Sequence, residues 1–394
     1  MAAVALSLTG LWNSPAWGQV LYMENFEVDP TANWTVNDGP TDEAADFFFD
    51  YSTVGIPSAP NSGGTTRGMK LQTNLIDAVF GGFSVSPNGQ SFTGDYALTF
   101  DWWHNFLGAE GTGVEAGANG STQLSQFGIL TSGTVANYAG AGDGVWFAAS
   151  GDGGTGSDYR AYSSERVISY QLPAVAPEDE HATYHAGSRN NTAQLYLDTF
   201  GGATVPEAQT NLFPETQFGV TADGAAGFAW HQVEIAKVGT TVTWKVNGTL
   251  LITVETAEFI TPTGGTNILF GQSDINSGLS QDPYYDDVQF TLIDNVKVST
   301  VTAPAEDADF DNDGDVDGED FLVWQRGFGP TGTNATGDAN GDNAVTAADL
   351  EVWKGKFGAT PPAASVSAVP EPATVIMAVL TAAGLAAASR RRRR

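Results

Sequence analysis

Thr241 to Val254 reads TVTWKV-NG-TLLITV, and this stretch decides the fold of most of the chain. Val242, Trp244 and Val246 alternate with polar residues, so they share one face of an extended strand. The Asn-Gly pair that follows is the preferred two-residue connection of a tight β-hairpin. The stretch therefore predicts two antiparallel strands that bury one common face.

Similar short alternating runs, separated by Gly, Asn, Asp and Ser, extend over residues 20–302. The chain has 394 residues with 47 glycines, 16% charged and 11% aromatic residues, which is typical of a turn-rich globular β protein. The sequence thus predicts a mainly β fold, a jelly-roll β-sandwich, over 20–302. Besides the hairpin, we expect strands at Tyr96–Trp103, Gly144–Ala148, Thr192–Leu197, Trp230–Ile235 and Val288–Val298.

The strand 230–235, the hairpin after it and the closing run Leu292-Ile-Asp-Asn-Val296 resemble the concanavalin-A-like sandwiches of laminin-G domains and carbohydrate-binding modules. In several such modules a first strand of Asn-x-Phe-Glu type lies beside a last strand of Asp-Asn-Val type, and their carboxylates share a structural calcium ion. By this resemblance we expect Glu27 and Asp294 to be calcium ligands, since calcium takes hard oxygen ligands. The alternative is that both are solvated carboxylates at strand ends.

Two copies of an oxygen-rich pattern lie twenty-nine residues apart near the C-terminal end. An EF-hand calcium loop takes its ligands from positions 1, 3, 5, 7, 9 and 12, with a backbone carbonyl at position 7. Position 6 is Gly314 in the first copy and Asn343 in the second, residue types that tolerate positive φ. The predicted metal ligands are Asp309, Asp311, Asp313, Asp315, Asp317 and Asp320, and then Asp338, Asn340, Asp342, Ala344, Thr346 and Asp349.

Each loop runs into a short apolar helix with repeated anchors, which are Phe321, Trp324 and Phe328, then Leu350, Trp353 and Phe357. A duplicated calcium loop with a helix only on its C-terminal side resembles the type I dockerin module. The resemblance implies a small α-helical domain over 303–360 with two EF-hand-like calcium sites, a cohesin-bearing partner and a link to polysaccharide degradation. Loop positions 10 and 11, which read the partner in that family, are Gly318-Glu319 and Ala347-Ala348 here instead of hydroxyl pairs.

The two ends of the chain predict export. Residues 1–19 begin with an apolar run and end in small residues, as a secretory signal peptide does, although a buried first strand is the alternative. Residues 361–372 form a linker that ends in Pro-Glu-Pro, and 373–394 combine an uncharged apolar run with five arginines, which predicts a C-terminal transmembrane helix. This order resembles the PEP-CTERM sorting signal and implies export to the bacterial cell envelope or matrix; a simple tail anchor is the alternative.

Composition limits the chemistry. Without any cysteine, disulfides, thiolate metal sites and cysteine nucleophiles are excluded, and a net charge of −30 argues against nucleic acid as a partner. We find no alternating Glu-x-Asp-x-(x)-Glu run of the kind that retaining glycosidases of this fold carry, and no nucleophile elbow or phosphate-binding loop. His181 and His185 would share a face for zinc only in a helix, and their surroundings predict a loop. We therefore expect no catalytic residues.

Adjacent aromatic pairs are candidates for stacking on sugar rings. Neighbours on a strand point to opposite faces, so one member of each pair should point away from the core. The candidates are Trp102 and Trp103, and Tyr284 and Tyr285, with burial in a core as the alternative. The sequence as a whole predicts an exported, calcium-binding protein that binds polysaccharide, with a diverged glycoside hydrolase or polysaccharide lyase as the first alternative and a structural matrix protein as the second.

Overall fold

The structure is a computed structural model, and it divides the chain into two units, residues 1–303 and 304–394. It describes residues 17–38, 42–76, 79, 81–107, 123–138, 141–164, 182–214, 216–259, 263–275, 278–279, 282–301, 306–329, 332–341 and 344–358. The predicted signal peptide up to residue 16, the linker 361–372 and the predicted transmembrane segment 373–394 lie outside these ranges. Among the described helices, none is long and apolar enough to cross a membrane.

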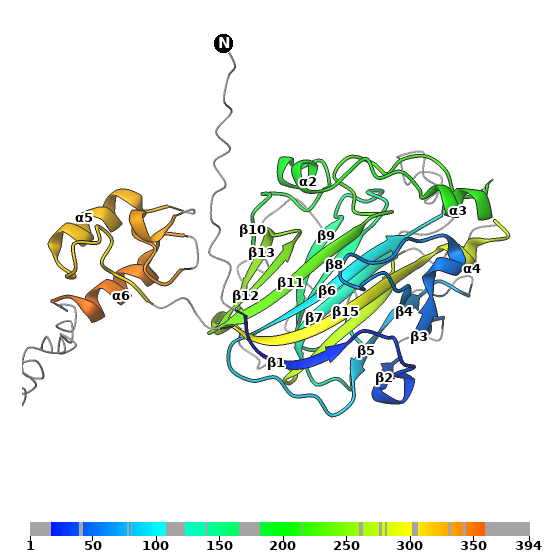
Figure 1. Cartoon of the computed structure of the whole chain (residues 1–394), viewed down its shortest axis with the longest axis horizontal. Helices are drawn as coiled ribbons and strands as arrows, with labels where there is room; N and C mark the ends of the chain where they lie inside the picture. The colour runs from blue at the N-terminus through cyan, green and yellow to red at the C-terminus, as the bar shows by residue number, and fades with distance from the viewer. Residues whose placement is uncertain are drawn as a thin grey trace, which may run out of the picture. The chain divides into compact units, whose positions relative to one another are not determined.

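The first unit is a two-sheet β-sandwich whose strand pairs are all antiparallel, as the alternating runs predict (Figure 1). The nine-stranded sheet has the order β10-β13-β12-β11-β6-β15-β4-β3, with β1 also paired to β15. Its strands are β1 (Trp17–Glu24), β3 (Ala44–Asp50), β4 (Arg67–Gln72), β6 (Tyr96–Asn105), β10 (Ala182–Tyr184), β11 (Trp230–Val238), β12 (Thr241–Val246), β13 (Thr249–Glu255) and β15 (Phe290–Val301).

The second sheet has six strands in the order β2-β5-β14-β7-β8-β9. They are β2 (Trp34–Asn37), β5 (Gly82–Pro87), β7 (Gln123–Thr131), β8 (Val145–Ser150), β9 (Tyr159–Ser163) and β14 (Asn267–Asp274). Short helices lie in the connections: η1 (Thr31–Asn33), η2 (Tyr51–Val54), α2 (Gln194–Thr199), α3 (Glu207–Leu212), η4 (Thr256–Glu258) and α4 (Tyr285–Val288).

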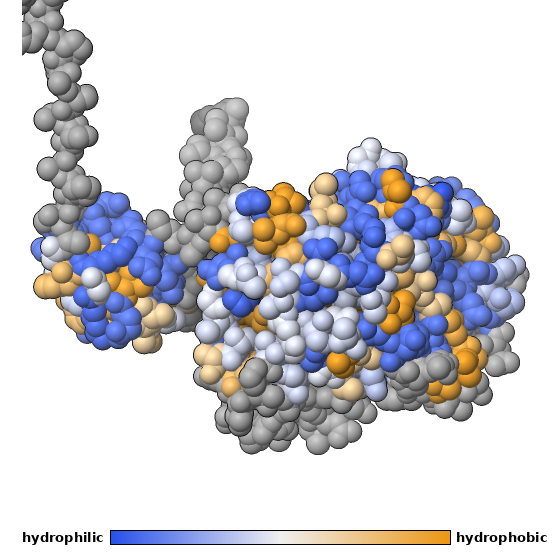
Figure 2. Space-filling model, turned by 90° about the horizontal axis from the view of Figure 1, so that it is seen from below, coloured by the Kyte–Doolittle hydropathy of each residue, from blue (hydrophilic) through white to orange (hydrophobic). Residues whose placement is uncertain are grey.

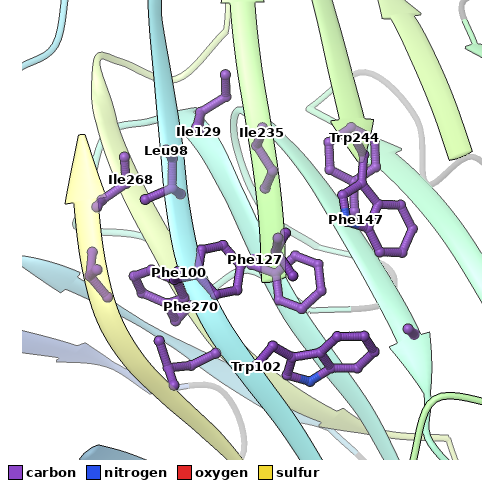
Figure 3. Packing of buried hydrophobic residues seen from close by; sticks show 14 of the residues in the cluster. Leu98, Phe100, Trp102, Phe127, Ile129, Phe147, Ile235, Trp244, Ile268 and Phe270 are labelled. Atoms are coloured by element: carbon purple, nitrogen blue, oxygen red, sulfur yellow. The ribbon is translucent and has the colours of Figure 1, made fainter. Parts of the chain in front are cut away.

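Aromatic side chains from both sheets form the core between them (Figure 3). Phe147 of the six-stranded sheet stacks on Trp244 of the predicted hairpin, with ring centroids 5.2 Å apart. Phe100 of β6 meets Phe270 of β14 edge-on at 5.0 Å. Because inward and outward residues alternate on each strand, this contact fixes which residues of β6, β11 and β15 point to the outer face of the nine-stranded sheet.

A second apolar layer covers one end of that outer face. Trp103 and Leu292 of the sheet pack there against side chains from the η2, α3 and α4 segments, including Val54, Phe213 and Val288. Toward the other end, the outer face is polar and is not under this layer. On the molecular face seen in Figure 2, hydrophobic residues form small separate patches among hydrophilic ones.

The second unit contains the helices α5 (Gly318–Gly327) and α6 (Ala347–Lys356) and the short η5 (Asn334–Thr336). Each long helix begins directly after position 9 of a predicted calcium loop, and Asp317 and Thr346 are its N-caps, both within capping boxes. Phe310, Val316 and Ala339 form a small core together with the partly buried Trp324 and Trp353.

One predicted strand is wrong. Thr192–Leu197 overlaps α2 instead of forming a strand, because Tyr196 is the one buried side chain of that helix and stacks on Tyr159 with ring centroids 4.0 Å apart. A short helix buries one side chain per turn, and Tyr196 of α2 is such a residue, packed against the edge strand β9. Tyr284 and Tyr285 likewise lie at the start of α4, not on a strand.

Candidate functional site

The first candidate site is the loop from Asp309 to Asp320. Carboxylate oxygens of Asp309, Asp311 and Asp313 lie within 4.8 Å of one another, and in the described part of the chain no other three His, Cys, Asp or Glu side chains meet this condition. The Asp313 carboxylate raises the pKa of Asp315, and partial desolvation together with Asp313 raises the pKa of the exposed Asp311. These carboxylates therefore repel one another and favour either protons or a shared cation.

The donor set fits a calcium ion. All the predicted ligands of this loop are hard oxygen atoms, and Asp315 Oδ1 is out of contact with solvent without a hydrogen-bond donor. Asn312 at position 4 has φ 58° and Gly314 at position 6 has φ 101°, the backbone conformations that turn the loop around a central point. The oxygen atoms that would hold the ion are those predicted from the sequence, with the backbone carbonyl of Asp315 at position 7.

The carboxylate at position 12 closes each loop in the same way. Asp320 accepts hydrogen bonds from the backbone N–H groups of positions 2, 3 and 9, at 2.6, 3.3 and 2.8 Å. Asp349 accepts the three equivalent bonds in the second loop, at 2.8, 3.2 and 2.7 Å. Both carboxylates are buried, so two loops of different sequence share one framework.

The second loop is described only in part, since Asp342 and Asn343 lie outside the described residues. Asp338 accepts a hydrogen bond from the N–H of Gly341 at 2.7 Å, and Thr346 caps α6 through its hydroxyl. Asn340 and Ala344 lie between them at positions 3 and 7. This loop offers fewer carboxylates than the first, with Asn and Thr at two of the ligand positions.

The second candidate site is the polar part of the outer face of the nine-stranded sheet. One row of side chains crosses four strands there: Lys245 pairs with Glu234, Glu234 with Thr99, and Thr99 with Lys297. The Lys245 ammonium lies 3.3 Å from a Glu234 carboxylate oxygen. In the next row Gln232 lies opposite Asp101, which lies opposite Asp294.

A groove of about 220 Å³ runs across these rows. Its residues come from β1 and the position directly after it, from β6, β11 and β15, and from the loop after η2. Most of them carry amide or other polar groups: Met23, Asn25, Asn61, Thr99, Phe100, Gln232, Asn295 and Lys297. The Phe100 side chain points into the core, so the apolar side chain at this surface is that of Met23. Amide groups beside it can hydrogen-bond the hydroxyls of a sugar whose C–H face contacts the apolar side chain. The groove is thus of a kind that suits a glycan.

Asp101 orients the amides in this groove although it is itself fully buried. It accepts bonds from Asn61 Nδ2 at 2.7 Å, from the Asn61 N–H at 3.0 Å and from Asn295 Nδ2 at 2.9 Å. Asn295 reaches it because β15 has a bulge after Asp294, where Asn295 takes φ 55°. With their NH2 groups committed to Asp101, both amides have their carbonyl oxygens available for hydroxyl donors.

Asp294 is buried beside Asp101 and is one of the two predicted calcium ligands of the sandwich. Burial, with smaller contributions from Asp101 and Glu27, raises its pKa to about 7. It accepts bonds from the Tyr51 hydroxyl at 3.1 Å and from the Asn295 N–H at 2.7 Å. Glu27 is near enough to act on this pKa, so the arrangement is compatible with a shared ion, and the calcium site remains a prediction.

The aromatic pairs do not provide the expected stacking surface at the tryptophans. Trp102 is 0% and Trp103 is 2% exposed. They do point to opposite faces, but Trp103 packs in the second apolar layer, which the alternation of the strand does not reveal. Tyr285 is also buried, and its hydroxyl accepts a bond from Asn74 at 2.7 Å, whereas Tyr284 is 43% exposed and touches Phe213 edge-on. Of the four rings, Tyr284 alone is open to a ligand.

Two of the described histidines, His104 and His231, are buried and hydrogen-bonded. Burial lowers the pKa of His104 to about 3 and that of His231 to about 4, so both are neutral. His231 bonds to Asn247 and to the Ala226 carbonyl, and it lines a second cavity of about 300 Å³ with small residues around it. His185 follows the strand β10, so the helical zinc pair is not formed there, and His181 lies outside the described residues.

No family model and no curated protein sequence matches the chain. Three solved structures that resemble it are a Bacillus subtilis protein of unknown function with a galectin-like fold, the exoplasmic/lumenal domain of VIP36 in its Ca2+/Man3GlcNAc-bound form, and a Bacillus licheniformis beta-glucanase. Their identities are 8%, 9% and 12%, and their TM-scores are 0.37, 0.32 and 0.31.

The matches cover 73%, 74% and 71% of this chain and 99%, 94% and 98% of those chains. With TM-scores this low, the β-sandwich assignment rests on the strand order and core described above. No residue of these proteins is carried over to this chain.

Proposed function

We propose that this chain is an exported protein whose second unit binds two calcium ions and whose sandwich binds a polysaccharide. The observation that carries the calcium part is the compact group of Asp309, Asp311 and Asp313 within a hydrogen-bonded loop framework that occurs twice. Clustered carboxylates in so small a unit destabilise it unless a cation balances them. Calcium would therefore occupy the two loops and also stabilise the fold of the whole second unit.

The second unit then acts as a docking module of the dockerin kind. Support comes from the two helices that each begin at position 10 of a loop, and from the exposed Phe328 and Phe357, which are 60% and 59% accessible and lie at equivalent places after them. A cohesin-bearing protein is the proposed partner. The non-hydroxyl residues at positions 10 and 11 imply a partner surface different from the usual one.

The proposed glycan site is the groove that Asn61, Gln232 and Asn295 line. This replaces the tryptophan pair, because buried rings cannot stack on a sugar. The jelly-roll type of the sandwich, the PEP-CTERM signal, the transmembrane helix and the envelope or matrix location belong to the same proposal. Together they describe a protein displayed outside the cytoplasmic membrane.

A non-catalytic role fits the groove better than hydrolysis. Asp101 and Asp294 are fully buried and hydrogen-bonded, and the Glu234 carboxylate lies 3.3 Å from the Lys245 ammonium, so these three carboxylates have partners within the fold. A glycosidase needs two carboxyl groups that reach opposite sides of the scissile bond. A diverged glycoside hydrolase or polysaccharide lyase is the alternative function, and a structural matrix role is the second.

The test of the glycan site is binding of the full chain to a panel of soluble polysaccharides by affinity electrophoresis, with release of reducing ends or unsaturated products measured in parallel. Gln232→Ala should weaken binding about fivefold or more if Gln232 bonds the ligand. Gln194→Ala, an exposed glutamine on α2, is the matched control and should bind like the wild type. Product release above background would favour the hydrolase or lyase, and absence of binding to any polysaccharide would favour the matrix role.

A further inference from the structure

The two repeats of the second unit contact each other through reciprocal hydrogen bonds. Trp324 of α5 donates its Nε1–H to the backbone carbonyl of Thr346 at 2.7 Å, and Trp353 of α6 donates to the carbonyl of Asp317 at 2.9 Å. Thr346 and Asp317 occupy position 9 of their loops. Each helix therefore contacts the opposite loop at a residue whose side chain is a predicted calcium ligand.

The neighbouring carbonyl of each loop is contacted in the same way. The N–H of Gly329, just after α5, donates to Val345 at 3.0 Å, and the N–H of Gly358, just after α6, donates to Val316 at 2.8 Å. Val345 and Val316 occupy position 8 and are both buried. Two successive carbonyls of each loop are thus fixed by the segment that follows the other loop.

Each of these helices is also joined to its own loop. Asp320 is the third residue of α5, and its carboxylate accepts three N–H groups of the first loop. An ion that binds Asp320 would order the first loop and the first turn of α5 together. Trp324 follows one turn later on the same helix, so that order extends to the carbonyl of Thr346 in the second loop.

We propose that Trp324 and Trp353 are positioning residues that couple the two calcium sites, so that an ion in one loop raises the affinity of the other. This inference rests on the proposed calcium binding and adds to it a regulation that the loop pattern does not contain. Coupling of this kind is reciprocal, so each site must strengthen the other by the same factor. One net hydrogen bond to a backbone carbonyl corresponds to about a fivefold change in affinity for each indole.

The test is isothermal titration of calcium into the full chain at fixed ionic strength. Asp309→Ala disables the first loop and isolates the second, and the ratio of second-loop affinities with and without an ion in the first loop gives the coupling. The same ratio is then measured in Trp324→Phe, which removes the N–H and keeps an aromatic ring, and in Trp353→Phe. Phe328→Leu is the matched control, because Phe328 touches the Trp324 ring but bonds to no loop carbonyl.

The coupling ratio should exceed about fivefold in the wild type, should fall by about fivefold in each Trp→Phe variant, and should persist in Phe328→Leu. Circular dichroism over a calcium titration is the second measurement, and a Trp→Phe variant should reach the helix content of the wild type at a higher calcium concentration. Two ions that bind the wild type independently, or a ratio unchanged in both Trp→Phe variants, would overturn the inference while leaving calcium binding intact. A wild type that binds no calcium would overturn the proposed function together with it.

Discussion

Replacing Asp294 with Asn should remove a strong pH dependence from the stability of the sandwich. Burial is the main cause that raises the pKa of Asp294 from 3.8 to about 7, with Asp101 and Glu27 adding to it and Tyr51 and the Asn295 N–H opposing it. Between these two values the folded protein binds a proton that the unfolded chain has released. The free energy of unfolding of the wild type should therefore fall as pH rises through this window.

The size of the effect follows from the shift. About three pKa units correspond to a loss of up to about 4 kcal/mol between pH 4 and pH 8, at 1.36 kcal/mol for each unit. Asp294→Asn keeps a carbonyl oxygen for the Asn295 N–H but does not titrate. Its free energy of unfolding should equal that of the wild type near pH 4 and exceed it at pH 8.

The assay is urea unfolding followed by tryptophan fluorescence at pH 4, 5.5 and 8, in EDTA so that calcium plays no part. Asp198→Asn, at an exposed carboxylate of α2, is the matched control and should follow the wild type. Parallel curves for the wild type and Asp294→Asn from pH 4 to pH 8 would refute the reasoning. Calcium added at pH 8 should restore stability to the wild type alone if Glu27 and Asp294 share an ion.

Two further predictions concern neighbours of Asp294 on the sheet. Asp101→Asn places an NH2 group against the NH2 groups of Asn61 and Asn295. The free energy of unfolding in urea should therefore fall by about 1–3 kcal/mol, and polysaccharide binding should weaken as well. A variant with full stability and full binding would contradict the role of Asp101. Trp102→Ala leaves a cavity between the sheets and should lower the free energy of unfolding by about 3–5 kcal/mol in the same assay. A decrease of only about 0.5 kcal/mol, as for a surface residue, would contradict the burial of Trp102.

The sandwich was predictable because its signals are local. The Asn-Gly turn and the alternation around Trp244 define β12 and β13, and the structure pairs these strands as predicted. The segment Thr192–Leu197 misled because its alternation of polar and apolar residues also suits a short helix with one anchor. Tyr159, with which that anchor packs, is more than thirty residues away in the chain, so no window around the segment contains the deciding contact.

The groove was not predictable in the same way. Asn25, Asn61, Gln232 and Asn295 come from distant segments and meet because β6 lies between β11 and β15. One local signal existed: Asp101 interrupts the apolar run of β6, and a carboxylate at such a position needs partners inside the fold. The alternation of β6 instead predicts that Trp103, beside Asp101, points away from the main core and is exposed. It does not reveal the second apolar layer that covers this side chain.

The loops of the second unit are the opposite case, because their spacing alone predicts which residues would be ligands. Position 12 is buried and closes each loop, as a twelve-residue calcium pattern requires. The reciprocal bonds from Trp324 and Trp353 were not predictable. A tryptophan on an apolar helix face gives the same sequence pattern whether it only packs in the core or also donates its N–H to another loop.

The central claim is that the second unit binds two calcium ions, and counting ions tests it most directly. Native mass spectrometry of the full chain after exchange into calcium should show a defined number of bound ions for the wild type. Asp309→Ala combined with Asp338→Ala should bind two fewer, while any ion shared by Glu27 and Asp294 is kept. The same count in the wild type and the double variant would contradict the account.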